Sequence, residues 1–324
     1  MSTYRQTFIS ANGIRLHVAE QGDGPLVILC HGFPETSHAW RHQLSALADA
    51  GYHAIAPDLR GYGASECPSA IGQYTSLDIV SDLVTLIDAL GERDAIVVGN
   101  DWGATIAWQA ALLRPDIFRA VAALGVPMMG RAPMAPSRLF PQSDRAWFYT
   151  HYFSIPGLAE RELERDVGAT LRKIYFSASG DIGARDQDTP NPFGLMPRNG
   201  GMLDPLSDPP AMPTWLASGD LEKFVQAFSI SGFRGGLNYY RNLDRNWEVQ
   251  AAFEGLLVQV PALYLVGERD TGLAIPGMQG IIDAMPQLVP NLRDSQVIPG
   301  AGHWLQQERP DCVNNALIKF FGEL

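Results

Sequence analysis

Cysteine and positive charge are both scarce in this chain. The 324 residues include three cysteines, Cys30, Cys67 and Cys312, which are too few and too scattered for a disulfide framework or a metal-ligand cluster. The 24 lysines and arginines are outnumbered by 35 aspartates and glutamates, giving a formal net charge of −11. Because so acidic a chain without a basic run does not attract polyanions, we expect no nucleic-acid partner.

Long hydrophobic runs are also absent. The first residues, Met-Ser-Thr-Tyr-Arg-Gln, lack the apolar stretch of a signal peptide, and no run approaches the ~20 apolar residues that span a bilayer. We therefore expect no stable membrane insertion and a cytoplasmic location. With 46% hydrophobic and 18% charged residues, the chain can fill a sizeable core, which argues against disorder.

Short apolar runs alternate with longer amphipathic segments. The predicted strands are Ile14–Ala19, Pro25–Cys30, His53–Pro57, Ala95–Gly99, Ala120–Val126, Ala262–Gly267 and Gln296–Pro299. Several are apolar throughout, as in strands covered on both faces. Helical spacing is seen in Ser76–Leu90, followed by Gly91, and in a last helix from Pro310. This alternation predicts an α/β fold with a mostly parallel sheet wrapped by helices.

The alternation stops after the fifth predicted strand and resumes before the sixth. In between, two aromatic helical stretches, Ala146–Phe153 and Leu221–Phe228, flank the Pro/Gly-rich passage Pro190–Pro213, which predicts a long irregular loop. We interpret the segment as an insertion that covers one end of the sheet. The predicted domains are a core of residues 1–130 and 249–324 and a helical lid of residues 131–248.

The stretch Ala95–Ala104 has the sequence Ala-Ile-Val-Val-Gly-Asn-Asp-Trp-Gly-Ala, which predicts a buried strand, a Gly-x-Asp-x-Gly turn and a helix to about Leu113. Small residues two before and two after the central position permit the strained turn that lifts a nucleophile above a sheet edge. Serine is the usual occupant, and here it is Asp101. The same aspartate could instead cap the helix that follows, and this window alone supports both interpretations evenly.

Other residues favour the nucleophile. His303 lies in Pro-Gly-Ala-Gly-His-Trp after the last predicted strand, and Asp270 lies in Gly-Glu-Arg-Asp after the preceding one. The chain order of nucleophile, acid and histidine, each after a strand, is that of α/β-hydrolase triads. In the His-Gly-Phe-Pro stretch after the second predicted strand, the main-chain N–H of Phe33 can join that of Trp102 in an oxyanion hole.

An aspartate nucleophile changes the chemistry. A carboxylate with an ordinary pKa of about 4 is ionised at pH 7 and needs no base for its attack. It attacks saturated carbon and leaves an alkyl ester on the enzyme, which His303, held by Asp270, would hydrolyse by activating water. A halide leaving group requires N–H donors, whereas an epoxide oxygen leaves as an alkoxide and requires proton donors such as tyrosine.

Over nearly its whole length the chain resembles the soluble epoxide hydrolases of the α/β-hydrolase superfamily. The matching stretches are His31–Glu35 with Trp40-Arg41, Pro57–Gly63, Asp101–Gly103, Tyr149–Gly157, Ser231–Asn242, Gly267–Asp270 and Gly302–Trp304. The resemblance implies an eight-stranded sheet with an inserted lid, a cofactor-independent reaction and two lid tyrosines that bind the epoxide oxygen. It assigns these roles to Tyr149 and Tyr240, which chemistry alone could not choose over their neighbours Tyr152 and Tyr239.

Three features depart from that family. The position before the nucleophile usually carries histidine and here carries Asn100, which could alter the support of the turn. Ala104 replaces a common glycine at a helix position. The passage Pro190–Pro213 is less like the family, so its effect on substrate access is open.

Two other functions stay open. Dehalogenases share the fold and the aspartate nucleophile, and Trp102 could donate to a halide, but their pattern often has asparagine where this chain has Phe33. A non-catalytic ligand-binding protein would lack a triad member, and all three are present. The main hypothesis is therefore an epoxide hydrolase that converts lipophilic epoxides and water to vicinal diols. Its apolar substrate contacts would be Phe33, Trp102 and Trp304, with core packing as the alternative, above all for Trp304. The physiological epoxide, the selectivity and the oligomeric state, including a homodimer, are left open by the sequence.

Overall fold

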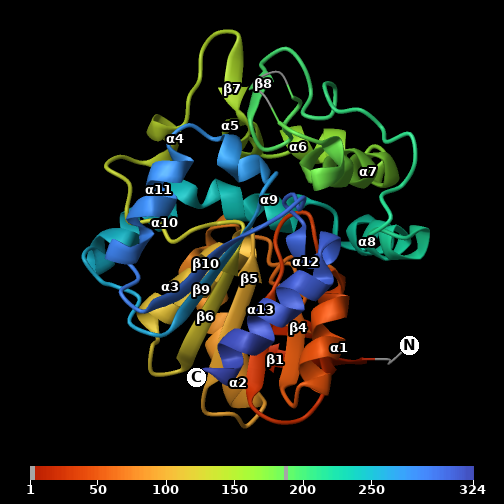
Figure 1. The fold of residues 1–324 in the computed structure, drawn as a ribbon. Helices are drawn as coiled ribbons and strands as arrows, with labels where there is room; N and C mark the ends of the chain where they lie inside the picture. Colours follow the sequence, from red (N-terminus) through yellow and green to blue (C-terminus); the bar gives the residue numbers. More distant parts are fainter. Residues whose placement is uncertain (1–3, 186–188) are drawn as a thin grey trace.

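An eight-stranded sheet forms the centre of the molecule (Figure 1). The computed structural model describes residues 4–185 and 189–324. The strand order is β1-β2-β4-β3-β5-β6-β9-β10. The strands are β1 (Arg5–Ala11), β2 (Ile14–Gln21), β3 (Leu26–Cys30), β4 (His53–Pro57), β5 (Ala95–Asn100), β6 (Phe118–Leu124), β9 (Ala262–Gly267) and β10 (Leu292–Ile298). From β4 to β10 every pair is parallel, whereas β2 pairs antiparallel with both β1 and β4. The predicted fold class is confirmed.

The strands that the sequence pattern identified best are those buried along their whole length. All residues of β3, β5 and β9 are buried, as expected of parallel strands covered by helices on both faces. The edge strands gave weaker signals. No apolar run marks β1, whose residues are mostly exposed or half-buried. The strand β10 begins at Leu292, earlier than the predicted Gln296. The apolar pattern missed this start because the residues after Leu292 are polar and exposed.

Helices cover the sheet. Among them, α1 (Arg41–Asp49) packs against α13 (Pro310–Gly322), and α2 (Ser76–Ala89) packs against α3 (Trp102–Leu113). Thr75 begins α2 with a capping box, in which its side chain accepts from the N–H of Asp78 and the Asp78 carboxylate accepts from the N–H of Thr75. The helix ends before Gly91, whose φ of 76° is the left-handed conformation expected of glycine after a helix.

The segment between β6 and β9 lies over the carboxyl ends of the strands, at the top of Figure 1. It contains α4 (Pro136–Leu139), β7 (Ala146–Phe148), α5 (Tyr149–Ser154), α6 (Leu158–Leu163), α7 (Val167–Ala178), β8 (Leu195–Pro197), α8 (Ser218–Ser231), α9 (Arg234–Arg241) and α10 (Leu243–Gln250). We call it the inserted segment. The predicted boundary at residue 249 falls inside α10, and the division into two domains stays a prediction.

One helix prediction in this segment was wrong at its start. The stretch Ala146–Phe153 begins as the strand β7, which pairs antiparallel with β8 of the Pro190–Pro213 passage. Its helix α5 begins at Tyr149. The pairing partner lies about 50 residues further along the chain, so local helical spacing could not reveal it.

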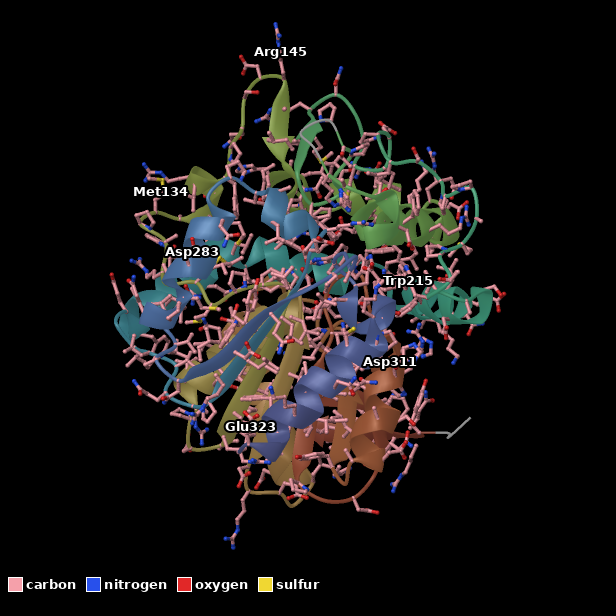
Figure 2. The ribbon with its side chains drawn as sticks, viewed as in Figure 1. Met134, Arg145, Trp215, Asp283, Asp311 and Glu323 are labelled. Atoms are coloured by element: carbon pink, nitrogen blue, oxygen red, sulfur yellow. The ribbon has the colours of Figure 1, made fainter. Side chains whose placement is uncertain are left out.

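The remaining helices are short. They are α11 (Met278–Ala284), α12 (Leu305–Glu308) and the 3-10 turns η1 (Ser37–Trp40), η2 (Ile71–Gln73), η3 (Gly180–Ile182), η4 (Ala251–Phe253), η5 (Thr271–Ala274) and η6 (Met285–Gln287). Within the described residues, no helix combines the length and apolar character that crossing a bilayer requires. Charged side chains such as Arg145, Asp283 and Asp311 point outward (Figure 2).

Candidate active site

Asp101 lies in the sharp turn between β5 and α3. Its φ of 55° and ψ of −119° are strained for a residue with a side chain. Two glycines make the turn possible, because a Cβ on Gly99 would collide with the carbonyl oxygen of Gly103, and one on Gly103 with that of Cys30. The Asp101 side chain makes no hydrogen bond that caps α3. The interpretation that this side chain caps the helix is therefore wrong.

The structure brings together Asp101, Asp270 and His303. Nδ1 of His303 lies 3.1 Å from each carboxylate oxygen of Asp270, and its Nε2 lies 3.4 Å from Oδ2 of Asp101. Each residue follows the carboxyl end of a parallel strand, namely β5, β9 and β10. The contact with Asp270 fixes the imidazole so that Nε2 faces the candidate nucleophile.

The two carboxylates also set the charge of His303. Burial acts to lower the pKa of this histidine, but the charge of Asp270 and the proximity of Asp101 outweigh burial and raise the pKa well above its ordinary value. The side chain of Asp270 is almost completely buried, so its charge is poorly screened by solvent. Imidazolium is therefore favoured while both carboxylates are ionised.

The predicted oxyanion-hole donors lie next to Asp101, the candidate nucleophile. The main-chain N–H of Phe33 donates to Oδ1 of Asp101 at 2.8 Å. Trp102 is the first residue of α3, where a main-chain N–H has no partner within the helix. A Cβ on Gly32 would collide with the Asp101 side chain, which shows how closely this loop approaches the nucleophile.

Tyr149 and Tyr240 converge from α5 and α9. Their ring centroids are 5.6 Å apart, and the Tyr240 ring lies 5.2 Å from that of Trp102. Burial and the charge of Asp101 raise the pKa of Tyr149. Burial, Tyr149 and Asp101 raise the pKa of Tyr240 well above its ordinary value. Both phenols therefore remain protonated at neutral pH within the electrostatic reach of Asp101.

The two neighbouring tyrosines have other partners. The hydroxyl of Tyr152 donates to Oε2 of Glu162 at 2.6 Å, and that of Tyr239 donates to the carbonyl oxygen of Arg60 at 3.0 Å. Both hydroxyls are therefore occupied by partners within the protein. The structure thereby separates the pair Tyr149 and Tyr240 from their neighbours, which the sequence alone could not do.

The three predicted substrate-contact aromatics differ in exposure. Trp102 keeps 8% of its surface exposed, whereas Phe33 and Trp304 keep 0%. The indole of Trp304 donates to the carbonyl oxygen of Tyr175 at 2.9 Å, and its ring lies 4.8 Å from the His303 imidazole. In this structure Phe33 and Trp304 therefore shape the site from within the protein interior.

A buried carboxyl group that the sequence argument did not single out lies beneath the site. Oε1 of Glu35 accepts from Nε2 of Gln307 at 2.7 Å and from Nε2 of Gln306 at 3.0 Å. Burial raises the pKa of Glu35 to about 7, with His303 acting to lower it and Asp101 to raise it. Glu35 is the last residue of the stretch His31–Glu35 that resembles the family, so the sequence contained a signal for it. The sequence did not indicate that Gln306 and Gln307 would be its partners.

The structure answers two questions that the sequence left open. Asn100 is buried, and its Nδ2 donates to the carbonyl oxygen of His303 at 3.3 Å, so it supports the histidine loop. From the Pro190–Pro213 passage, the ring of Phe193 lies 5.4 Å from that of His303 and 5.6 Å from that of Tyr149. This passage therefore contributes an aromatic ring that packs against both side chains.

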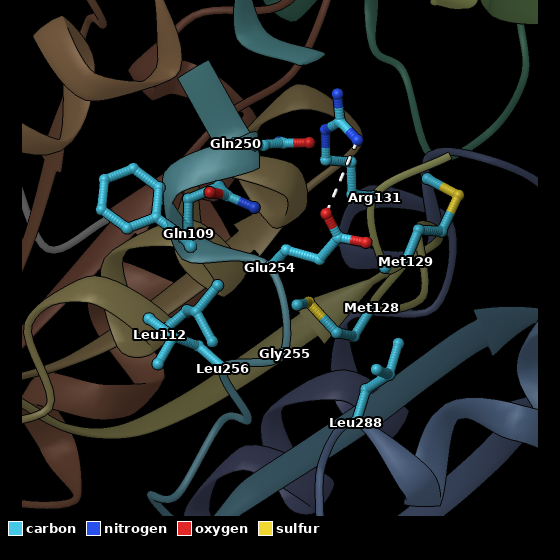
Figure 3. A pocket seen from close by; sticks show the side chains of 12 residues that line it. Gln109, Leu112, Met128, Met129, Arg131, Gln250, Glu254, Gly255, Leu256 and Leu288 are labelled. Atoms are coloured by element: carbon cyan, nitrogen blue, oxygen red, sulfur yellow. Dashed lines mark ion pairs between the residues drawn. The ribbon is translucent and has the colours of Figure 1, made fainter. Parts of the chain in front are cut away.

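A cavity of about 220 Å³ lies elsewhere, where the inserted segment leaves and rejoins the sheet (Figure 3). Met128, Met129 and Leu256 line it, and Arg131 and Glu254 form an ion pair of 3.7 Å at its side. None of the predicted site residues lines this cavity. Across residues 4–185 and 189–324, no group of three or more His, Cys, Asp or Glu side chains is arranged to hold a metal ion.

Comparisons with known proteins identify the family of the chain. Residues 25–310 match the family model of the alpha/beta hydrolase fold. The chain is 41% identical to Epoxide hydrolase A of Mycobacterium tuberculosis over 99% of this chain and 98% of that protein. It is 38% identical to Epoxide hydrolase 2 of Siraitia grosvenorii over 99% of each chain. The solved structure of an epoxide hydrolase from an endophytic Streptomyces matches with a TM-score of 0.93 and 41% identity, covering 99% of this chain and 96% of that one.

Proposed function

The chain belongs to the epoxide hydrolases of the α/β-hydrolase family, and on this premise we propose that it converts lipophilic epoxides and water to vicinal diols through a covalent ester on Asp101. The observation that carries the mechanism is the convergence of Tyr149 and Tyr240, both with pKa values raised in part by the charge of Asp101. A halide would not need these proton donors, whereas an epoxide oxygen does.

In the first step the carboxylate of Asp101 attacks a ring carbon. A C–O bond to the carboxylate forms, the C–O bond of the epoxide breaks, and the leaving oxygen takes a proton from Tyr149 or Tyr240. Ester formation removes the negative charge of Asp101. Because that charge helps to raise the pKa of both phenols, its loss makes them stronger acids as the leaving oxygen becomes basic.

In the second step His303 takes a proton from water, which attacks the carboxyl carbon of the ester. The N–H of Phe33, which already donates to Oδ1 of Asp101, and that of Trp102 stabilise the tetrahedral oxyanion. Collapse breaks the ester C–O bond, and the departing alkoxide takes the proton from His303 and leaves as the diol. The proton of the regenerated Asp101 acid returns to the tyrosinate. Loss of the Asp101 charge in the ester also lowers the pKa of His303, so the imidazolium releases a proton to solvent and is neutral when a base is needed. It takes up a proton again when the Asp101 carboxylate is regenerated.

Aromatic rings around the nucleophile support an apolar substrate. The ring of Phe33 lies 5.5 Å from that of Phe153 and 5.6 Å from that of Tyr240. Such a surround favours aryl or alkyl epoxides because it buries their apolar surface. A cytoplasmic location and a homodimer stay predictions.

A single turnover in oxygen-18 water tests the mechanism. Enzyme in excess is mixed with a simple aryl epoxide, and the diol is analysed by mass spectrometry. Unlabelled diol is expected, because the new oxygen comes from the Asp101 carboxylate and the label enters the enzyme. Labelled diol would show direct attack by water and overturn the ester mechanism. If a varied epoxide panel gives no diol, the activity itself is refuted, and halide release becomes the next assay.

A further inference from the structure

Glu308 holds three main-chain N–H groups with one buried carboxylate. Its Oε2 accepts from Gly180 at 2.8 Å and from Gly302 at 2.9 Å, and its Oε1 accepts from Trp304 at 3.0 Å. The residue is the last of α12 and is 5% exposed. The epoxide hydrolysis described above gives it no role.

Two of these donors flank the catalytic base. Gly302 and Trp304 are the residues on either side of His303, so both its neighbours are fixed by the same carboxylate. The third donor, Gly180, belongs to the inserted segment. Glu308 therefore joins the histidine loop to that segment.

The two segments meet main chain to main chain. The N–H of His303 itself donates to the carbonyl oxygen of Ala178 at 2.9 Å. A Cβ on Gly180 would collide with the carbonyl oxygen of Gly300, and one on Gly302 would collide with the N–H of Gly180. Such close contact leaves the histidine loop little freedom while Glu308 keeps its bonds.

A carboxylate suits this position better than an amide. A carboxylate presents acceptors on both oxygens, whereas a glutamine would offer one oxygen and turn an NH₂ group toward at least one of the three N–H donors. Leaving a buried N–H without a partner is costly. Burial raises the pKa of Glu308 to about 7, and the three N–H groups act to lower it. The two acceptor oxygens of Glu308 thus complement the three main-chain N–H donors around His303.

We propose that Glu308 is a positioning residue for ester hydrolysis. It orients Nε2 of His303 toward the Asp101 ester, and this orientation depends on the hydrogen bond between Glu308 and Gly180 of the inserted segment. The proposal rests on the proposed two-step function. Alkylation uses Asp101 and the two lid tyrosines, and none of these three side chains contacts Glu308 through a hydrogen bond or an ion pair in the described structure. Loss of Glu308 should therefore slow the second step selectively.

The test compares Glu308→Gln and Glu308→Asp with the matched control Glu162→Gln. Glu162 also accepts from two main-chain N–H groups, those of Met202 at 2.9 Å and Leu203 at 3.0 Å. Both of these donors lie within the inserted segment, away from the histidine loop. The control therefore shows how the same substitution changes the rates of ester formation and ester decay when the lost hydrogen bonds lie within the inserted segment only.

Rapid mixing with an aryl epoxide, followed by mass spectrometry of the quenched protein, gives the rates of ester formation and ester decay. In Glu308→Gln, ester decay should slow by roughly 10- to 100-fold, the scale expected of a misplaced catalytic group, with ester formation changed by less than about threefold. The ester should then accumulate. Glu308→Asp, which keeps a carboxylate, should lose less, and Glu162→Gln should keep the wild-type ratio of the two rates. An unchanged ratio in Glu308→Gln would overturn the proposal. If that variant does not fold, the ratio in Glu308→Asp decides in the same way.

A second measurement does not depend on the mechanism. Hydrogen–deuterium exchange of the wild type and of Glu308→Gln compares the peptides that contain Gly180 and His303. Faster exchange confined to these two peptides is expected, and unchanged exchange in both would overturn the proposal. If the wild type forms no ester, the proposed function fails, while exchange still decides whether Glu308 holds the histidine loop.

Discussion

The main-chain N–H of Phe33 donates a hydrogen bond of 2.8 Å to Oδ1 of Asp101. The other oxygen, Oδ2, faces Nε2 of His303 at 3.4 Å. The two oxygens of one carboxylate are therefore distinguished before any substrate binds. We expect Oδ2 to attack the epoxide and Oδ1 to become the carbonyl oxygen of the ester, because the charge that develops on Oδ1 during hydrolysis then meets a donor already in place.

Removing the lid hydroxyls should slow the first step. Tyr240→Phe alone should reduce the rate of alkylation by about 10- to 100-fold, and the double change with Tyr149→Phe should nearly abolish turnover, because general acids contribute roughly 10²- to 10⁴-fold. Tyr239→Phe, whose hydroxyl is bonded to Arg60, is the control. The single-turnover rate of ester formation is the measurement, and an unchanged rate in Tyr240→Phe would remove this residue from the acid role.

The basicity of His303 should differ between the free enzyme and the ester. In the free enzyme, burial acts to lower the pKa of His303, while Asp270 and Asp101 together raise it by more. The ester lacks the charge of Asp101, so ester hydrolysis should rise with pH through a pKa lower than that of His303 in the free protein. Rapid-mixing rates across pH give the first value and an NMR titration of His303 gives the second. Equal values would contradict the coupling to Asp101.

Ionisation of Glu35 should destabilise the fold. Its pKa in the folded protein is raised by burial to about 7, so its favourable contribution is present below the ordinary carboxyl range and is lost as pH rises through about 7. Glu35→Gln should lack this loss. Its free energy of unfolding relative to that of the wild type should therefore rise by on the order of 3 kcal/mol between about pH 5 and pH 8. Urea unfolding across that range is the measurement. The exposed Glu323→Gln is the control and should show no such trend.

Trp304 should matter for stability more than for substrate affinity. Trp304→Phe removes the donor to the carbonyl oxygen of Tyr175 and leaves a gap in a fully buried region, which should lower the free energy of unfolding by about 1–3 kcal/mol. KM should change by less than about twofold. A tenfold rise in KM with unchanged stability would instead indicate direct contact with the substrate.

Much of the fold, and the positions of Asp101, Asp270 and His303 after their strands, could be predicted from local patterns. The buried strands β3, β5 and β9 are nearly continuous apolar runs. The Gly-x-Asp-x-Gly sequence predicts a sharp turn because only small residues fit at its two glycine positions. Weaker local signals failed. The strand β1 is mostly exposed or half-buried, and β7 depends on a partner in a distant loop.

The sequence by itself determined which chemistry to expect, since an aspartate in that turn, followed by an acid and a histidine after later strands, is the pattern of a nucleophile and its base. Only the tertiary structure decided which hydroxyl and carboxyl groups lie around these residues. The hydroxyl of Tyr239 donates to the carbonyl oxygen of Arg60, whereas the ring of Tyr240 packs against Trp102 beside Asp101. Glu308 differs from any surface glutamate in the three N–H groups around it. Such partners are brought together from distant parts of the chain by packing, and no spacing of neighbouring residues records them.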